Sequence, residues 1–493
     1  MIAKRTADFI DGARLGDMPQ AVLDQAKMAI LDWFAAFLLA FAEDRASIEP
    51  LLKTMKRLGG NRTASIIGSR IRTSPAWAAL VNGYAGHLLD YDETTPPVRS
   101  HLTAVVLPAV IAMSEEKGST GADLLEAYVV GYEVALRLGE AMTPGWMQEG
   151  WHGTPMFGIF GAAAGCGKIE RLSADALERV LGIVSSMASG IVTNFGTMTK
   201  PLHAGHAAKN AVIATLLAEE GLTASATAIE GFFHSHSWSK PAKAESFERL
   251  GNPWALETKG TINPKLYPCC HGLATTIEYG LVFREKYGLM ADQVEEIEVY
   301  ASPKALSAMH SRRYADTGKD LEWDYEGPPR QLAPGIPSTG KEAKFSKEYG
   351  FAAAFLRGSP ESRDFTDEAV ARADVQDLMK KVKIFHDCEL DKISYQYPEG
   401  DWPYGERFVL RLKDGRTIRE EQLFVLGAAR RPLSMAHVEK KFRACASSSG
   451  FPSDQTEGLI HIVEKIEVIG SVSEMLGRFL LDRAAVRTKR TRR

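Results

Sequence analysis

The sequence predicts a mainly α-helical protein, with a large all-helical domain and a smaller α/β domain. Apolar residues recur at helical spacing up to about residue 260 and again after about residue 430, whereas the alternation typical of strands is confined to the stretch between. The 493 residues are also too many for one ordinary hydrophobic core. We therefore expect a helical domain over 1–260, an α/β domain over 261–430, C-terminal helices over 431–485 that pack back on the helical domain, and a basic disordered tail over 486–493.

The first part of the chain contains six segments whose apolar residues predict helices, over Gln20–Phe41, from Ser74-Pro75 onward, and over Asp123–Met142, Thr154–Gly167, Ala174–Gly190 and Pro201–Glu220. The apolar arc of the first segment is wide, which predicts a well-buried helix. Ser74 and Pro75 are typical of the N-cap and the first helical position. The glycines and alanines of the run GIFGAAAGCG allow another helix to approach closely.

The middle block predicts strands over Val294–Ala301, Lys381–His386 and Glu406–Leu412. Asp414-Gly415 stands between two alternating runs and predicts a hairpin. The Gly- and Pro-rich stretch Glu326–Gly340 is expected to be a loop that reaches a site. Helical spacing returns over Ser434–Cys445 and Val472–Leu481.

Composition and charge exclude several function classes. The net charge of −3 gives no global attraction to nucleic acid or to an anionic membrane, and the basic tail is too short to argue otherwise. The apolar run Trp33–Ala42 is much shorter than the roughly 20 residues that span a bilayer, and the first 15 residues mix charges of both signs. Five scattered cysteines argue against a disulfide framework and for a reducing, cytoplasmic location.

Two segments of the helical part concentrate polar residues that suit anion binding. In the first, Asp90 and Thr94 are four residues apart and share a face if the helix continues, and Arg99 and His101 follow a Pro-Pro break before the next helix. The alternative is helix capping and surface charge. The second is Gly150–Pro155, whose His152 and Thr154 precede the small-residue helix; the alternative there is a loop with a hydrogen-bonded histidine.

A third segment, Thr197–His206, places Lys200 at or just outside a helix start, where a lysine can bind a carboxylate or act in proton transfer. His203 lies about one turn further on; the alternative is that His203 and His206 only pack in a helix interface. The fourth segment is Lys265–His271, where adjacent cysteines before His271 make a poor metal site.

Motifs for bound cofactors are missing from the sequence. No iron–sulfur cysteine pattern, phosphate loop, dinucleotide fingerprint or serine-hydrolase elbow is found. The polar residues that remain are His, Lys, Asp, Thr and Tyr. These residue types predict acid–base chemistry without a cofactor or a metal.

Five motifs in order, LLDYDET with His101 after it, GWHGTP, GTMTKPLHAGHAAKNAV, KLYPCCHG and GKEAKFSKEY, resemble the MmgE/PrpD family. That family includes 2-methylcitrate dehydratase, cis-aconitate decarboxylase and iminodisuccinate epimerase. The resemblance covers roughly Ala21–Tyr349 and weakens toward the end. It implies an all-helical domain built from both chain ends, a smaller α/β lid domain, a homodimer, and a metal-free active site in the cleft between the domains.

By motif, the resemblance implies that the active site contains Asp90, Thr94, His101, His152 and Lys200, with His271 near a further histidine of the lid. One departure stands out. Decarboxylase members place a tyrosine a dozen residues before the EAKFS-like motif, where this chain has Gln331, and Tyr325 is the nearest tyrosine. The insert His310–Pro337 is also unlike the family pattern. These differences argue against itaconate formation and leave the substrate open.

The expected function is therefore a hydro-lyase like 2-methylcitrate dehydratase, acting on a small di- or tricarboxylate by proton abstraction next to a carboxylate. Epimerisation and decarboxylation are the alternatives; an inactive helical dimer is disfavoured because the candidate site residues occur together. His101 and His152 are the expected acid and base, Asp90 orients a histidine, Lys200 holds a carboxylate, and His271 closes over the substrate. The other expected substrate contacts are Thr94, Arg99, Thr154, His203, Lys265 and Tyr325.

Overall fold

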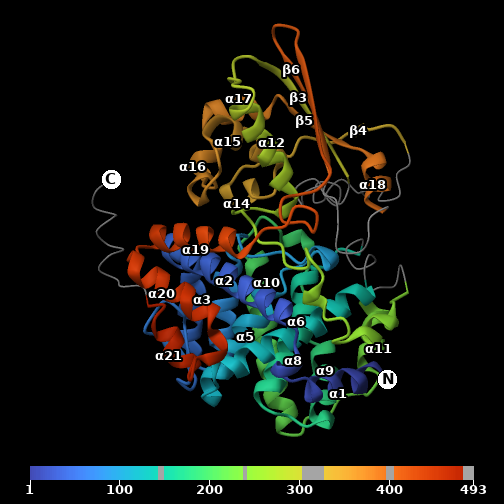
Figure 1. Ribbon diagram of the computed structural model, residues 1–493, viewed down its shortest axis with the longest axis vertical. Coiled ribbons are helices and arrows are strands. Elements are labelled where there is room, and N and C mark those ends of the chain that lie inside the picture. Colours follow the sequence, from blue (N-terminus) through green and yellow to red (C-terminus); the bar gives the residue numbers. More distant parts are fainter. Residues whose placement is uncertain (143–148, 237–240, 303–326, 396–404, 481–493) are drawn as a thin grey trace. The chain divides into compact units, whose positions relative to one another are not determined.

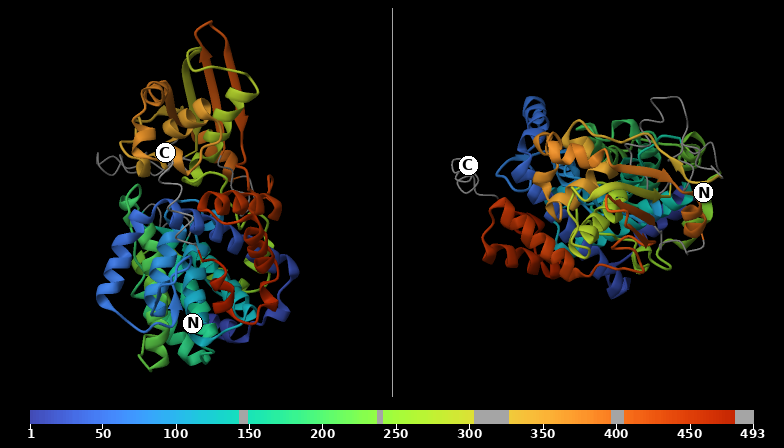
Figure 2. Two further views of the ribbon diagram at one scale, coloured as in Figure 1. Left: turned by 90° about the vertical axis from the view of Figure 1, so that its left-hand side faces the viewer. Right: turned by 90° about the horizontal axis from the view of Figure 1, so that it is seen from above.

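The computed structural model describes residues 1–142, 149–236, 241–302, 327–395 and 405–480. The chain divides into two compact units, shown in Figures 1 and 2. The helical unit comprises Met1–Ile191, Pro201–Pro264 and the C-terminal part from Ser434 onward, and the sheet unit comprises Val192–Lys200 and Lys265–Leu433. The fold class is thus confirmed as mainly α with a smaller α/β part. The predicted basic tail lies outside the described residues.

The described helices of the helical unit come from both parts of the chain. They are α1 (Ile2–Gly12), α2 (Gln20–Glu43), α3 (Arg45–Leu58), α4 (Pro75–His87), α5 (Thr103–Lys117), α6 (Gly121–Met142), α8 (Gly153–Ile169), α9 (Ala174–Ser185), α10 (Thr199–Glu219), α11 (Ala228–His236), α19 (Met435–Ser449), α20 (Ser453–Glu464) and α21 (Val472–Gly477). Helix α10 begins in the short segment that belongs to the sheet unit. Helix α9 ends five residues before the predicted Gly190.

Helices α5, α6 and α8 pack closely in the core of this unit. A Cβ atom on Gly161 of α8 would lie only 2.3 Å from the carbonyl oxygen of Gly131 on α6. Glycine at this crossing therefore lets the two backbones touch, and the close approach predicted from the small-residue run is confirmed.

Helix α2 is long and apolar enough to cross a membrane by length and composition alone. However, 89% of its most apolar 18-residue window is buried inside the fold. The C-terminal helices α19 and α20 pack on α2, as the adjacent blue and red helices of Figure 1 show. This packing joins the first and last parts of the chain in one core.

The sheet unit contains a five-stranded sheet of order β4-β5-β3-β6-β7. Its strands are β3 (Val294–Ala301), β4 (Arg330–Gln331), β5 (Val382–His386), β6 (Glu406–Leu412) and β7 (Thr417–Gln422). Strands β3 and β5 are parallel and the other pairs are antiparallel. The three predicted strands and the hairpin at Asp414-Gly415 are confirmed, with Gly415 at φ 87° in the turn.

The apolar face of this sheet packs against helices of the same unit. The described helices are α12 (Ala274–Glu285), α14 (Gly340–Ala343), α15 (Lys347–Arg357), α16 (Asp367–Val370), α17 (Ala373–Met379) and α18 (Cys388–Tyr395). The stretch that we expected to be entirely loop contains β4, which adds two residues to the edge of the sheet beside β5. A separate two-stranded ladder in the helical unit pairs β1 (Ala64–Ser65) with β2 (Arg72–Thr73).

Candidate active site

Four imidazole rings form a row inside the helical unit, which we call the histidine row. Ring centroids are 4.5 Å apart for His101 and His87, 6.3 Å for His87 and His152, and 5.2 Å for His152 and His203. The first three side chains are buried and His203 is half-buried. They come from the loop before α5, the last residue of α4, the N-cap of α8 and the first turns of α10. The row therefore brings together three predicted site residues and His87, which we did not predict.

Asp92 lies between two rings of the row. Both of its carboxylate oxygens are 2.9 Å from Nδ1 of His87, and Oδ2 is 3.2 Å from Nδ1 of His101. Burial raises the pKa of Asp92, but attraction to the two imidazoles and their hydrogen bonds outweigh burial and hold this pKa well below its usual range. An ionised Asp92 thus orients both rings.

The same contacts decide which ring nitrogen of His101 can react. Its Nδ1 also lies 2.8 Å from the carbonyl oxygen of Glu93, so this nitrogen faces two acceptors and carries a proton. Nε2 points toward Asp90, whose Oδ1 is 3.6 Å away, beyond hydrogen-bond length. Nε2 is therefore the atom of His101 suited to exchanging a proton with a substrate.

The expected shared helix face of Asp90 and Thr94 is wrong. Helix α4 ends at His87, and Asp90 adopts a left-handed backbone conformation with φ 54°. The chain then turns, and the backbone of Thr94 pairs with Asn263 through two N–H···O bonds of 2.9 Å. After this turn Asp92 lies against Nδ1 of both His87 and His101, and Asp90 lies on the Nε2 side of His101.

Glu93 is a second acidic residue that the sequence did not single out. Its side chain is fully buried, and burial raises the pKa of its carboxyl to about 8. Oε1 accepts a hydrogen bond of 3.2 Å from the N–H of Thr103, and the Thr103 hydroxyl bonds to that of Tyr128. Glu93 therefore keeps its proton at neutral pH, beside an ionised Asp92. The sequence contained a signal for this residue, because Asp90, Asp92 and Glu93 form an acidic run between two apolar helical segments.

His152 and Thr154 connect the start of α8 to the row. Nδ1 of His152 lies 3.0 Å from Nδ1 of His203, and the backbone N–H of His152 donates to Gly190. The hydroxyl oxygen of Thr154, an expected substrate contact, accepts a 3.0 Å hydrogen bond from the N–H of His101. Thr154 thus positions the backbone of His101.

Lys200, Lys265 and His271 belong to the sheet unit, and all three are buried. The ammonium of Lys200, in the first turn of α10, lies 5.2 Å and 5.1 Å from the ring centroids of Phe195 and Phe345. Such a site favours a cation and removes it from water. A desolvated ammonium of this kind suits a carboxylate partner.

His271 begins a short 3-10 helix, and the motif GKEAKFSKEY holds the loop before it. Lys344 donates a 2.7 Å hydrogen bond to the carbonyl of Pro268, and its own carbonyl accepts one from the N–H of Cys270. Lys347 donates to the carbonyl of Gly272. The motif thus fixes the backbone on both sides of His271.

The remaining predicted residues are less informative. Arg99 is half-buried and has φ 47°, directly after a 3-10 turn at Pro96–Val98. Gln331, at the position of the family tyrosine, is exposed on β4. Tyr325 and most of the atypical insert lie outside the described residues.

A metal could be considered at His87, Asp90, Asp92 and His101, which offer ligand atoms within 4.8 Å of one another. Nδ1 of both histidines is already directed at Asp92. A cation bound through those atoms would replace hydrogen bonds that the buried carboxylate has. These four side chains therefore suit a network of hydrogen bonds between histidines and carboxylates.

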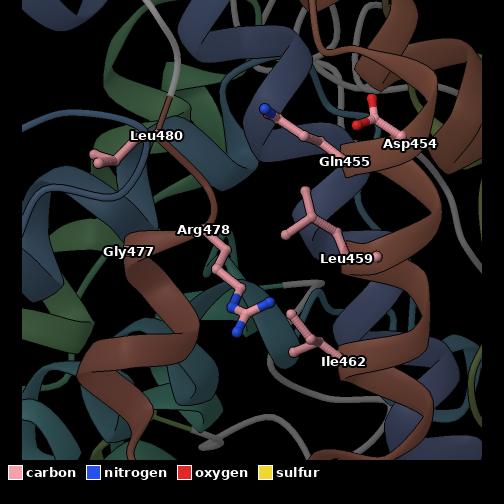
Figure 3. A pocket seen from close by; sticks show the side chains of 8 residues that line it. Asp454, Gln455, Leu459, Ile462, Gly477, Arg478 and Leu480 are labelled. Atoms are coloured by element: carbon pink, nitrogen blue, oxygen red, sulfur yellow. The ribbon is translucent and has the colours of Figure 1, made fainter.

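A separate hollow of about 450 Å³ lies on the C-terminal helices. Figure 3 shows the side chains that line it. Leu459 and Ile462 of α20 face Arg478, which follows α21. None of the predicted site residues lines it, and its charged side chains are Asp454 and Arg478. Among the described residues that line it there is no histidine or lysine for acid–base chemistry, so it is not the candidate active site.

Comparison with known proteins agrees with the motifs. Residues 4–243 match the MmgE/PrpD N-terminal domain and residues 267–467 match the MmgE/PrpD C-terminal domain. A cis-aconitate decarboxylase of Mus musculus is 29% identical over 94% of this chain and 91% of that protein, and one of Homo sapiens is 28% identical over 94% and 92%. A cis-aconitate decarboxylase of Aspergillus terreus is 27% identical over 93% and 92%. The chain belongs to the MmgE/PrpD family.

Proposed function

We propose that the protein is a cofactor-independent lyase that acts on a small di- or tricarboxylate by proton transfer at a carbon next to a carboxylate. One observation carries the proposal: Asp92 and the Glu93 carbonyl hold Nδ1 of His101, so that this buried ring exchanges protons through Nε2 alone. His152 supplies a second imidazole two rings along the row. Two oriented imidazoles in a buried setting suit general acid–base catalysis near neutral pH.

The first candidate reaction is decarboxylation of an acid resembling cis-aconitate, because the relatives that span the chain carry that name. The bond from carbon to the leaving carboxylate breaks, CO₂ departs, and the electron pair stays on the carbon skeleton. One proton from the enzyme then completes the product. In this proposal His101 or His152 gives that proton, and Lys200 stabilises the negative charge on a remaining carboxylate.

The second candidate is dehydration of a hydroxy acid resembling 2-methylcitrate, the reaction that the sequence favoured. The exposed Gln331 at the position of the family tyrosine supports it, because that position differs from the decarboxylases. Dehydration needs a base that removes a proton next to a carboxylate and an acid that protonates the leaving hydroxyl.

The resemblance also implies a homodimer, and we include this oligomeric state in both proposals. Light scattering of the purified protein tests it, because a dimer has twice the mass of the single chain.

The test is proton NMR of the purified protein in D₂O with cis-aconitate, citrate, 2-methylcitrate and an iminodisuccinate-type acid. Release of CO₂ with one deuterium in the product establishes a decarboxylase, and a new alkene with loss of water establishes a dehydratase. Deuterium exchange without a new carbon skeleton indicates an isomerase. Silence on all four acids refutes the proposal.

The site assignment has its own matched pair of variants. His101→Gln should lower turnover by about 10²–10⁴-fold, the usual contribution of a general acid or base. His461→Gln replaces a histidine of α20 whose side chain is 71% exposed, and should leave turnover unchanged. Equal activity of the two variants would remove His101 from the chemistry.

A further inference from the structure

We propose that His203 is a proton-relay residue, which supplies a proton to the far side of the His152 ring while Nε2 of His152 gives a proton to the substrate. The inference rests on the proposed lyase function. Its basis is the 3.0 Å distance between Nδ1 of the buried His152 and Nδ1 of the half-buried His203. The outer ring is the one nearer to exchange with solvent.

Two ring nitrogens at this distance share one proton, because a hydrogen bond needs a donor on one side and a lone pair on the other. When Nδ1 of His203 carries the proton, a neutral His152 has its own proton on Nε2 and is an acid. When Nδ1 of His152 carries it, Nε2 of a neutral His152 is a lone pair and a base. The position of one proton in the His152–His203 bond thus sets the role of His152.

The surrounding backbone is built for this contact. His152 is the N-cap residue of α8, and its backbone N–H donates a 3.0 Å hydrogen bond to the carbonyl of Gly190. Gly190 has φ 112°, and a Cβ there would lie 2.6 Å from Pro155 and 3.4 Å from the ring of His203. Glycine at this position therefore avoids a clash with Pro155 and permits the positive φ of the backbone that accepts the hydrogen bond of His152.

The proton balance of decarboxylation gives the relay its purpose, since each turnover consumes one proton from outside. Nε2 of His152 gives a proton to the carbon as Nδ1 takes one from Nδ1 of His203, and Nε2 of His203 takes one from water. After product release, Nε2 of His152 takes a proton from solvent, the shared proton returns to His203, and Nε2 of His203 releases one. The net uptake is one proton, and no buried imidazolium or imidazolate accumulates.

The test compares His203→Gln with His206→Gln. His206 is half-buried one turn further along α10 and bonds to Asn210 at 3.0 Å, so it is a matched control outside the row. In dilute buffer His203→Gln should lose about tenfold to a hundredfold in turnover, less than the loss of about 10²–10⁴-fold expected for a group that itself exchanges a proton with the substrate, because His203 acts through His152. Raising the concentration of imidazole buffer should restore much of this loss, and the wild type and His206→Gln should not respond.

A second measurement does not depend on activity. Ring ¹⁵N signals of His152, assigned with His152→Gln, should shift in His203→Gln and stay in place in His206→Gln. Full turnover of His203→Gln, a loss that imidazole does not restore, or an unshifted His152 signal each overturns the relay. If the wild type converts none of the acids, the proposed function fails, and the ¹⁵N measurement still decides whether the two rings share a proton.

Discussion

Lys441, on the C-terminal helix α19, is predicted to hold the loop that carries the acidic residues of the site. Its Nζ lies 2.7 Å from Oδ1 of Asp32 on α2 and 2.5 Å from the carbonyl oxygen of Tyr91. Tyr91 stands between Asp90 and Asp92, and the ammonium lies 3.9 Å from the centroid of its ring. Lys441→Met keeps an unbranched side chain, one atom shorter than that of lysine, and removes the charge. We expect this variant to lose both stability and turnover.

The magnitude follows from burial. The side chains of Lys441 and Asp32 are 2% and 0% exposed, and removing one partner of such a pair costs about 3–5 kcal/mol. The Tyr91 carbonyl also loses a charged donor, which frees the loop. Because a shift of about 1 Å in a reacting group lowers rates by up to about 10²-fold, we expect turnover to fall by at least about tenfold.

Lys27→Met is the matched control. Lys27 also joins α2 to the C-terminal part of the chain, with its Nζ 2.8 Å from Oε2 of Glu467, and Glu467 is 34% exposed. Breaking this pair should cost less free energy of unfolding and leave turnover unchanged. Urea unfolding gives the first quantity, and turnover is measured where both variants are folded. The reasoning is refuted if Lys441→Met turns over like Lys27→Met.

Three further predictions concern stability. Burial raises the pKa of Glu93 to about 8. Between about pH 4.5 and 8 the carboxyl therefore keeps its proton in the folded protein and loses it in the unfolded chain. The free energy of unfolding consequently falls as the pH rises through this window. Glu93→Gln should remove a slope of up to about 1.4 kcal/mol per pH unit in urea unfolding at pH 6 and 8; an unchanged slope contradicts this. Gly161→Ala should lower the free energy of unfolding by at least about 1–3 kcal/mol, because the added methyl group overpacks the crossing of α8 and α6. The control Gly231→Ala lies on α11, where a Cβ meets nothing within 4 Å, and should raise the free energy of unfolding by up to about 1 kcal/mol. Equal melting temperatures of the two variants would contradict the close packing at Gly161. Lys347→Met should lower the free energy of unfolding by about 3–5 kcal/mol, because it leaves the fully buried carboxyl of Glu406 without the lysine that pairs with it. The double variant Lys347→Met/Glu406→Leu should recover most of this loss in denaturant unfolding. No recovery would contradict the ion pair as the origin of the loss.

The parts of the fold that the sequence predicted are those that depend on local patterns. The helical spacing over Gln20–Phe41 and the alternation over Val294–Ala301 match α2 and β3. Periodicity is set by which face of one element is buried, so a single segment carries the signal. Strand β4 has two residues, too few for any period, and it was missed for that reason.

The arrangement of the site depends on contacts that no local pattern contains. The argument that Asp90 and Thr94 share a face failed because the helix ends at His87 and the chain turns through a left-handed residue. Only after this turn does Asp92 lie between two imidazoles. The bond from Lys441 to the Tyr91 carbonyl joins residues 350 positions apart. The motifs identified the segments that carry the candidate residues, and the packing of distant segments determines which of those residues contact one another.

The burial of the neighbouring carboxyls of Asp92 and Glu93 supports a role for them in the proposed chemistry. Asp92 and Glu93 lie in a unit whose interior is otherwise rich in apolar side chains, and a buried carboxyl is costly even when it is hydrogen-bonded. A buried ion pair is often no more stable than apolar residues of the same volume, so stability alone gives little reason to keep these acids. Two adjacent carboxyls whose pKa values shift in opposite directions, one lowered by two imidazoles and one raised by burial, provide an ionised group that orients histidines and a neutral group that keeps its proton. Neighbouring titratable groups whose pKa values are displaced in opposite directions are typical of acid–base sites, which agrees with the proposed function.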